Sequence, residues 1–238
     1  AFLAQKRANE KALRARVTAN PALATAYGDA WDRIAVAEKA LRARGRARQL
    51  HDIGRVSRLV DLANGIVRLT AEVEKPNEKR FREYRDANLS SQRFQLLSPA
   101  PVYPALEEAV LAARLRTCLD SLGAGDAWLS AGLGGRAPDA VAHELVSGSK
   151  LADVAERKKL LEGGLAAVEA STDPLIVWAR HVDPAYREER KWYEDTVESV
   201  EALEGARIAK AVFALDGPTN YPDATGTLRL SYGKTAGY

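Results

Sequence analysis

Three histidines are the side chains of this sequence best suited to binding a metal, and their spacing argues against such a site. His51, His143 and His181 lie far apart along the chain, and none has a histidine partner one helical turn away. Such a pair is the usual way for a helix to supply two zinc ligands. The single cysteine, Cys118, leaves no cysteine pair for structural zinc either. We therefore expect no metal and no cofactor.

Two short motifs fit known catalytic patterns in spacing but not in context. Gly233-Lys234-Thr235 matches the end of a phosphate-binding loop, yet that loop needs a glycine five residues earlier, where Leu228 stands. Ser147 and Lys150 have the Ser-x-x-Lys spacing of penicillin-recognising enzymes, but the companion motifs of those enzymes are absent from the sequence. Neither motif is interpreted as a site.

One arginine-rich stretch could in principle bind nucleic acid; it contains Arg42, Arg44, Arg46, Arg48, Arg55 and Arg58. On a helix, Arg42 and Arg46 share one face while Arg44 and Arg48 share another, so the charge is not focused into a stripe. No aromatic residues interleave for base stacking, and the net charge is only +3, from 35 basic and 32 acidic residues. We interpret the stretch as a solvated, salt-bridged face and expect no nucleic-acid partner.

The cysteine and the tryptophans are interpreted as packing residues. Cys118 lies on a helical pattern, where a small buried or half-buried apolar residue is expected rather than a reactive thiol. Four tryptophans are too widely spaced for one motif, and each lies on an amphipathic pattern for which core packing is the default: Trp31, Trp128, Trp178 and Trp192.

The composition is that of a soluble globular protein, with 46% hydrophobic and 28% charged residues among 238. No apolar run approaches the length of a membrane span, so no membrane partner is expected. The chain contains no methionine and opens inside a helical pattern. These features suggest an internal piece of a longer polypeptide.

Helical spacing dominates residues 1 to about 215. Apolar residues recur at three- and four-residue steps from Leu23 to Leu41 and again from Ile53 to Thr70. After a proline-rich crossing loop, a helix is predicted to begin at Pro104 and to end at Gly123. The pattern predicts an irregular antiparallel helical domain with chain reversals near Pro21, Pro76, Gly123, Gly134 and Asp183.

Aspartates mark helix starts in the second half of the chain. Asp153, Asp173 and Asp183 are each predicted N-caps, and the last two are followed by Pro174 and Pro184 at the first helical position. From Pro184 a long charged helix is expected to run to about residue 215.

The pattern changes after Asp216 to Asn220. Leu228, Leu230 and Tyr232 alternate with polar residues, as in a strand. A lone strand cannot satisfy its own backbone groups, so we expect this one to belong to a β-sheet whose other strands are missing. Arg229, on the polar face, is a weak candidate for substrate contact.

Five blocks, in the same order along the chain, resemble the bacterial dipeptidyl-peptidase 7 and 11 family of serine exopeptidases. They are Pro76–Arg80 with Glu83–Asp86, Leu97–Pro104, Leu145–Asp153, Ala170–Leu175 and Tyr221–Tyr238. One departure is Gly226, where the family typically has a bulky aromatic residue, and a glycine there weakens a strand or marks a bulge.

The resemblance implies a helical cap or regulatory domain over residues 1–215. Residues 216–238 would then be a hinge and a strand that re-enters a chymotrypsin-like catalytic barrel. The parent protein, the longer polypeptide to which this chain would belong, would be a periplasmic or extracellular homodimer. It would release dipeptides from oligopeptides with a free N-terminus. In the family, the serine, histidine and aspartate of the triad lie in barrels on either side of the helical domain. The resemblance therefore assigns no catalytic residue to this chain.

The expected hinge is formed by Asp216, Gly217 and Pro218, where helix gives way to strand and glycine can absorb a change in backbone angle. The alternative interpretation is a free-standing helical module that binds partner helices without catalysis. A stand-alone module would carry no orphan strand.

Overall fold

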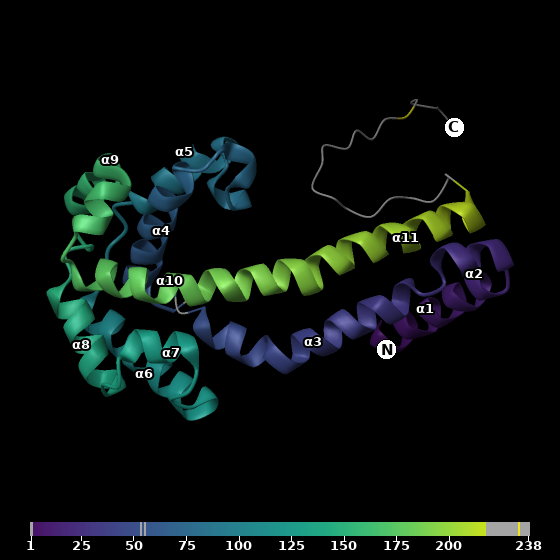
Figure 1. Ribbon diagram of the computed structural model, residues 1–238, viewed down its shortest axis with the longest axis horizontal. Helices are drawn as coiled ribbons and strands as arrows, with labels where there is room; N and C mark the ends of the chain where they lie inside the picture. Colours follow the sequence, from purple (N-terminus) through teal and green to yellow (C-terminus); the bar gives the residue numbers. More distant parts are fainter. Residues whose placement is uncertain (1, 53, 55, 218–232, 234–238) are drawn as a thin grey trace, which may run out of the picture. The chain divides into compact units, whose positions relative to one another are not determined.

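The computed structural model describes residues 2–52, 54, 56–217 and 233, and its helices are shown in Figure 1. Within these residues the secondary structure is helical, without a strand. The prediction of a mainly α-helical fold is therefore confirmed. The strand predicted at 225–232 lies outside the described residues.

The chain divides into two compact units, one of residues 1–38 and 198–238 and the other of residues 39–197. The predicted division into a helical domain at 1–215 and a segment at 216–238 stays a prediction. Helix α3 (Ala30–His51) contributes residues to both units.

The first unit contains α1 (Phe2–Thr18), α2 (Pro21–Tyr27), the first turns of α3, and α11 (Ser199–Asp216). Asn20 caps α2 by accepting a hydrogen bond from the N–H of Ala22 at 3.1 Å, as expected for a helix that begins with proline. Among the described residues of this unit, an apolar cluster contains Val17, Ala30, Trp31 and Ala211, with partly buried apolar side chains packed against it.

Ion pairs supplement that core. Arg16 on α1 pairs with Asp216 at the end of α11. Glu204 on α11 is almost fully buried and accepts from Arg33 at 3.4 Å, and Arg207 reaches Asp29 at 2.6 Å. The charges of α3 and α11 therefore help to hold this unit together.

In its described residues, the second unit contains the C-terminal part of α3 and a series of further helices. They are α4 (Arg58–Val73), η2 (Asn77–Lys79), η3 (Arg82–Tyr84), α5 (Asp86–Leu96), α6 (Pro104–Leu122), α7 (Ala127–Leu133), α8 (Pro138–Gly148), α9 (Val154–Ala170) and α10 (Pro174–Tyr193). A five-residue π-helix, η4 (Glu194–Glu198), joins α10 to α11.

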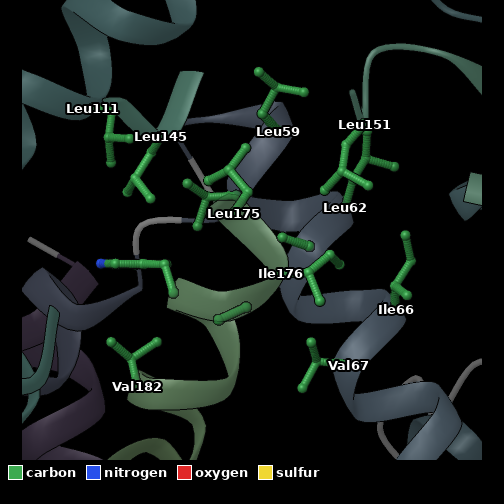
Figure 2. Close-up of a cluster of buried hydrophobic side chains, with 14 of the residues drawn as sticks. Leu59, Leu62, Ile66, Val67, Leu111, Leu145, Leu151, Leu175, Ile176 and Val182 are labelled. Carbon is green, nitrogen blue, oxygen red and sulfur yellow. The ribbon is translucent and has the colours of Figure 1, made fainter. Parts of the chain in front are cut away.

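Helix α4 is central to the packing of the second unit, with α9 and α10 against it, while α6 packs on α8. Its buried face carries Leu59, Leu62 and Ile66 at three- and four-residue steps, and Leu175 and Ile176 of α10 lie in the same cluster (Figure 2). Burial of each such side chain contributes roughly 1.5–3 kcal/mol. The apolar spacing therefore explains why these helices associate.

Helix α4 begins later than the spacing predicts. It starts at Arg58, because the hydroxyl of Ser57 caps it by accepting from the N–H of Val60 at 3.2 Å. Val56, which the spacing places on the buried stripe, is exposed.

The chain reversal predicted near Asp183 is wrong. Helix α10 runs without a break from Pro174 to Tyr193 and contains Pro184 in its interior. An interior proline removes one backbone hydrogen bond and costs about 3 kcal/mol. The buried face of α10 and the ion pairs of Asp183 offset this cost, and Asp183 does not act as an N-cap.

Gly45 offers a test of helix propensity inside α3. It lies in the helix interior, and a Cβ placed there would meet no atom within 4 Å. We expect Gly45→Ala to raise the free energy of unfolding by roughly 0.5–1 kcal/mol, because alanine loses less backbone entropy in a helix. Chemical denaturation of both proteins measures this change in the free energy of unfolding.

Gly134 provides the matched control, because a Cβ there would also meet open space but the backbone has φ of +55°. Gly134→Ala should lower the stability by about 1 kcal/mol, since L-residues disfavour this conformation. Equal effects of the two substitutions would contradict the account.

Candidate functional site

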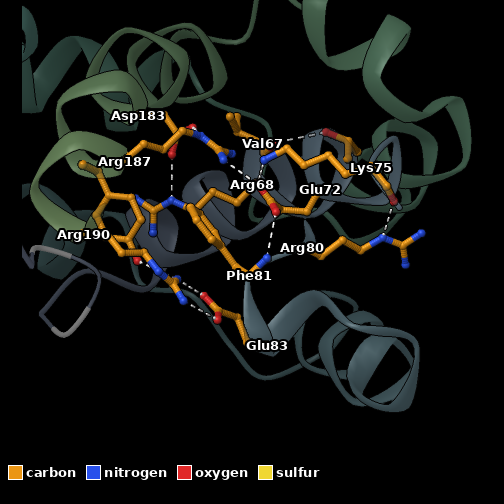
Figure 3. A network of polar contacts seen from close by, with 12 residues as sticks. Val67, Arg68, Glu72, Lys75, Arg80, Phe81, Glu83, Asp183, Arg187 and Arg190 are labelled. Carbon is orange, nitrogen blue, oxygen red and sulfur yellow. Dashed lines mark hydrogen bonds and ion pairs between the residues drawn. The ribbon is translucent and has the colours of Figure 1, made fainter. Parts of the chain in front are cut away.

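A polar network joins α4, α10 and the segment that carries η2 and η3 (Figure 3). We call it the clamp; it consists of Arg68, Glu72, Phe81, Glu83, Asp183, Arg187 and Arg190. Arg68 and Glu72 lie one turn apart on α4, and Asp183, Arg187 and Arg190 lie one turn apart from each other along α10. The helical repeat therefore aligns the charges of the two helices.

Glu72 is the most buried charge of the clamp, with no exposed surface. One carboxylate oxygen accepts from Arg187 and from Lys75, the latter at 2.6 Å. The other oxygen accepts from the N–H of Phe81 at 2.9 Å. Burial by itself raises the pKa of Glu72, but these hydrogen bonds outweigh it and hold the pKa below its usual range. Glu72 is therefore a buried carboxylate that stays ionised.

Asp183 connects the two helices through both of its oxygens. Arg68 donates to one oxygen at 2.8 Å, and Arg187 donates to the other. The guanidinium of Arg68 also lies 3.4 Å from the centre of the Tyr186 ring. The carboxylate of Asp183 is thus bound by an arginine of α4 and by an arginine of its own helix, α10.

The segment that carries η2 and η3 is attached by Arg190 and Phe81. Arg190 forms a two-pronged pair with Glu83, with one N–O distance of 3.0 Å, and donates to Glu194 at 2.6 Å. The Phe81 ring lies under the guanidiniums of Arg190 and Arg187, at 3.8 and 4.9 Å. Burial opposes the charge of Arg190, but these carboxylates dominate and raise its pKa above the usual range.

The clamp is built to hold elements together and not to transfer protons. Both carboxylate oxygens of Glu72, Asp183 and Glu83 accept hydrogen bonds from the partners named above. Burial raises the pKa values of Glu72 and Glu83, but hydrogen bonds from their arginine partners outweigh it and lower both pKa values, which weakens each carboxylate as a general base. The chemistry available here is therefore positional.

Two further sequence blocks meet at Asp173. Its carboxylate caps α10 through the N–H of Leu175 at 3.0 Å. It also accepts from the hydroxyl of Ser149 at 3.1 Å and from the N–H of Lys150 at 2.7 Å. One aspartate therefore joins the block at 145–153 to the block at 170–175.

The block at 97–104 is fixed by Arg157 of α9, which is 1% exposed. Its guanidinium donates to the carbonyl oxygens of Leu96 and Ser98, the latter at 3.1 Å. Burial, followed by the nearby charge of Arg58, lowers the pKa of Arg157. Carbonyls at the end of α5 favour a cation, which explains a buried arginine at this place.

The predicted hinge residues are described only in part. Asp216 pairs with Arg16, and Gly217 ends α11 with φ of 74° while its N–H donates to the carbonyl of Phe213 at 2.9 Å. The positive φ suits glycine. Pro218 and Arg229 lie outside the described residues.

The three histidines lie in separate places. His51 contacts Asp126 at 2.9 Å and stacks on Trp128 with ring centres 4.9 Å apart. His143 contacts Glu108 at 3.1 Å, and His181 is exposed on α10. In the described part of the chain, no three histidine, cysteine, aspartate or glutamate side chains gather as metal ligands.

The arginine-rich stretch is exposed at Arg42, Arg44, Arg46 and Arg48, as expected for a solvated face. Arg44 and Arg48 lie over the rings of Trp192 and Tyr193, at 4.5 and 3.6 Å. Arg44 also approaches Glu189 at 3.7 Å. Stacking on aromatic rings thus accompanies the ion pair of Arg44, and Arg55 lies outside the described residues.

The remaining packing residues are placed as expected, with one exception. Cys118 is fully buried, and burial raises the pKa of its thiol to about 11. Trp31, Trp128 and Trp178 are buried, whereas Trp192 is half-buried under Arg44.

The clamp was not predicted from the sequence. A signal was available, because Arg80, Glu83 and Asp86 belong to a block that resembles the peptidase family and occur there without apolar periodicity. In the structure Arg80 pairs with Asp86 at 2.7 Å beside the clamp. Charges without periodicity indicate a segment that is held by ion pairs and not by an apolar face.

None of the described helices has both the length and the apolar character needed to cross a bilayer. A protein-family model described as Peptidase S46 matches residues 1–238, the whole of the chain. The match agrees with the family resemblance of the five sequence blocks.

Proposed function

This chain belongs to the peptidase S46 family, and we propose that it is the helical cap of a serine dipeptidyl-peptidase. In this proposal the parent releases dipeptides from the N-terminus of oligopeptides, and the cap restricts the catalytic cleft to chain ends. The observation that carries the proposal is a peptidase-family match over a chain whose described secondary structure is helical.

A cap explains how an exopeptidase refuses the middle of a chain. A lid over the cleft blocks extension past the second subsite and buries groups that pair with the terminal ammonium. Opening and closing of such a lid would gate entry and release. The clamp supports this role, because it joins α4, α10 and the η2–η3 segment into a stiff scaffold.

The triad is assigned to parts of the parent outside this chain, and a periplasmic or extracellular homodimer is proposed on the same resemblance. The free-standing interaction module is the weaker alternative, because a peptidase-family match over all 238 residues favours the parent peptidase.

We expect the isolated 238-residue chain to release no product from dipeptidyl chromogenic substrates. Hydrolysis by this class requires a nucleophile, its base and an oxyanion hole assembled together. The parent protein, assayed in parallel, should hydrolyse the same substrates and lose this activity with a serine-directed inhibitor. Inhibitor-sensitive hydrolysis by the isolated chain would refute the assignment, and an inactive parent would refute the proposed peptidase.

A further inference from the structure

Two arginines of α3 lie over aromatic rings of α10, and all four residues belong to the second unit. The guanidinium of Arg48 is 3.6 Å from the centre of the Tyr193 ring, and that of Arg44 is 4.5 Å from the centre of the Trp192 ring. Contact with the face of a ring restrains a guanidinium but does not use its N–H groups, which lie in the guanidinium plane. The rings therefore hold both arginines in place and leave their donors available.

The donors of Arg44 and Arg48 are free within the part of the chain that the structure describes. Neither guanidinium donates a hydrogen bond there, and Arg44 approaches an oxygen of Glu189 only at 3.7 Å, which is too long for one. The side chain of Arg44 is 54% exposed, and Arg48 is exposed as well. The two residues lie one helical turn apart, so their side chains are neighbours. A ligand in solution can therefore reach both at once.

Glu189 is the carboxylate that competes with such a ligand. Burial raises the pKa of Glu189, and the charges of Arg44, His51 and Arg48 oppose this effect. His51 is itself paired with Asp126, at 2.9 Å. Since Glu189 forms no hydrogen bond with Arg44, loss of its charge should favour an anion at the arginines without releasing them from the rings.

We propose that Arg44 and Arg48 bind a phosphate group. Each guanidinium can form a two-pronged pair with an oxyanion, and a phosphate group has enough oxygens to accept from both, whereas one carboxylate satisfies a single fork. Because the rings already restrain the two side chains, little of their freedom is lost on binding. The phosphate group belongs either to a free ion or to a lipid headgroup, and its chemistry at the arginines is the same.

NMR titration of the full 238-residue chain with inorganic phosphate, at constant ionic strength, tests this proposal. The arginine Nε–H signals and the indole N–H signal of Trp192 report on the site. We expect saturable shifts in the native chain. The double substitution Arg44→Gln and Arg48→Gln should raise the dissociation constant at least about tenfold, because charge-assisted hydrogen bonds are lost. Acetate should bind the native chain roughly tenfold more weakly than phosphate.

The matched control is the double substitution Arg42→Gln and Arg46→Gln. These arginines have the same spacing on α3 and are also exposed, but Arg46 donates to the hydroxyl of Ser121 at 3.0 Å instead of lying over a ring. The dissociation constant for phosphate should change by less than about twofold in this variant, since only distant, screened charge is removed. Glu189→Gln should lower the dissociation constant roughly threefold, because it removes the competing charge.

A second arm identifies the source of the phosphate group. Vesicles that contain phosphatidic acid are sedimented with the native chain and with each double variant. Binding of the free ion or of the vesicles that depends on Arg44 and Arg48 supports the site, and the ligand that binds is the source. Equal binding by the native chain and the Arg44/Arg48 variant would overturn the proposal. So would an equal loss in the control variant, or acetate binding as tight as that of phosphate.

Discussion

Replacement of Glu72 by glutamine is expected to lower the free energy of unfolding by about 3 kcal/mol, the loss typical of breaking a buried ion pair on one side. Arg187, Lys75 and the N–H of Phe81 are all donors to this carboxylate. The amide group of glutamine must therefore point its own donors at one of them. Urea unfolding followed by tryptophan fluorescence measures the loss.

The matched control is Glu144→Gln, which removes an exposed pair with Arg136. We expect a change within about 0.5 kcal/mol there, because solvent already screens that pair. Similar losses at the two positions would show that the clamp does not stabilise the fold.

The effect of Glu72→Gln should also depend on pH. The folded pKa of Glu72 is lower than its usual value of 4.5. Its contribution to stability is therefore fully present above about pH 4.5 and is lost as the pH falls through the folded pKa. The difference between native and variant proteins should shrink with acidification, and a constant difference would contradict the assigned charge.

Replacement of Trp178 by alanine is expected to cost about 3–5 kcal/mol, as for other large buried aromatic residues. The ring is 3% exposed and meets Trp128 edge-on, with ring centres 5.7 Å apart. Its Nε1–H donates to the carbonyl of Gly132 at 2.9 Å. The substitution thus removes both packing and a buried hydrogen bond between α10 and α7.

Trp178→Phe separates these two contributions, because it keeps a ring but leaves the Gly132 carbonyl without its donor. We expect a loss of about 1–3 kcal/mol, the cost of an unsatisfied buried acceptor. Calorimetry on both variants measures which substitution causes the larger loss of stability. A phenylalanine variant as unstable as the alanine variant would show that ring packing contributes little.

The sequence predicted those features that depend on neighbouring residues. Asp153 and Asp173 cap helices as expected, and Gly123 ends α6 with φ of 77°. Each of these depends on backbone groups within a few positions, so the local sequence contains the required information. The helical character of residues 2–52 and 56–216 follows from the same kind of signal.

Asp183 shows that neighbouring residues do not determine every helix start. Asp173-Pro174 and Asp183-Pro184 are the same dipeptide, yet the first starts α10 and the second lies inside it. One group that distinguishes the second is Arg68, which lies 115 positions earlier in the chain and binds Asp183 at 2.8 Å. The clamp was missed for the same reason, since its partners are distant in sequence and share no periodic pattern.

The central claim is that these helices cap a cleft and confine the parent peptidase to chain ends. Its most direct test is the digestion of one oligopeptide, with a free or an acetylated N-terminus, by the full parent enzyme, with products identified by mass. The account predicts that the native parent releases successive dipeptides from the free peptide and none from the acetylated peptide. A parent carrying Glu72→Gln in the clamp should begin to cleave the acetylated peptide. Equal cleavage of both peptides by the native parent would contradict the account.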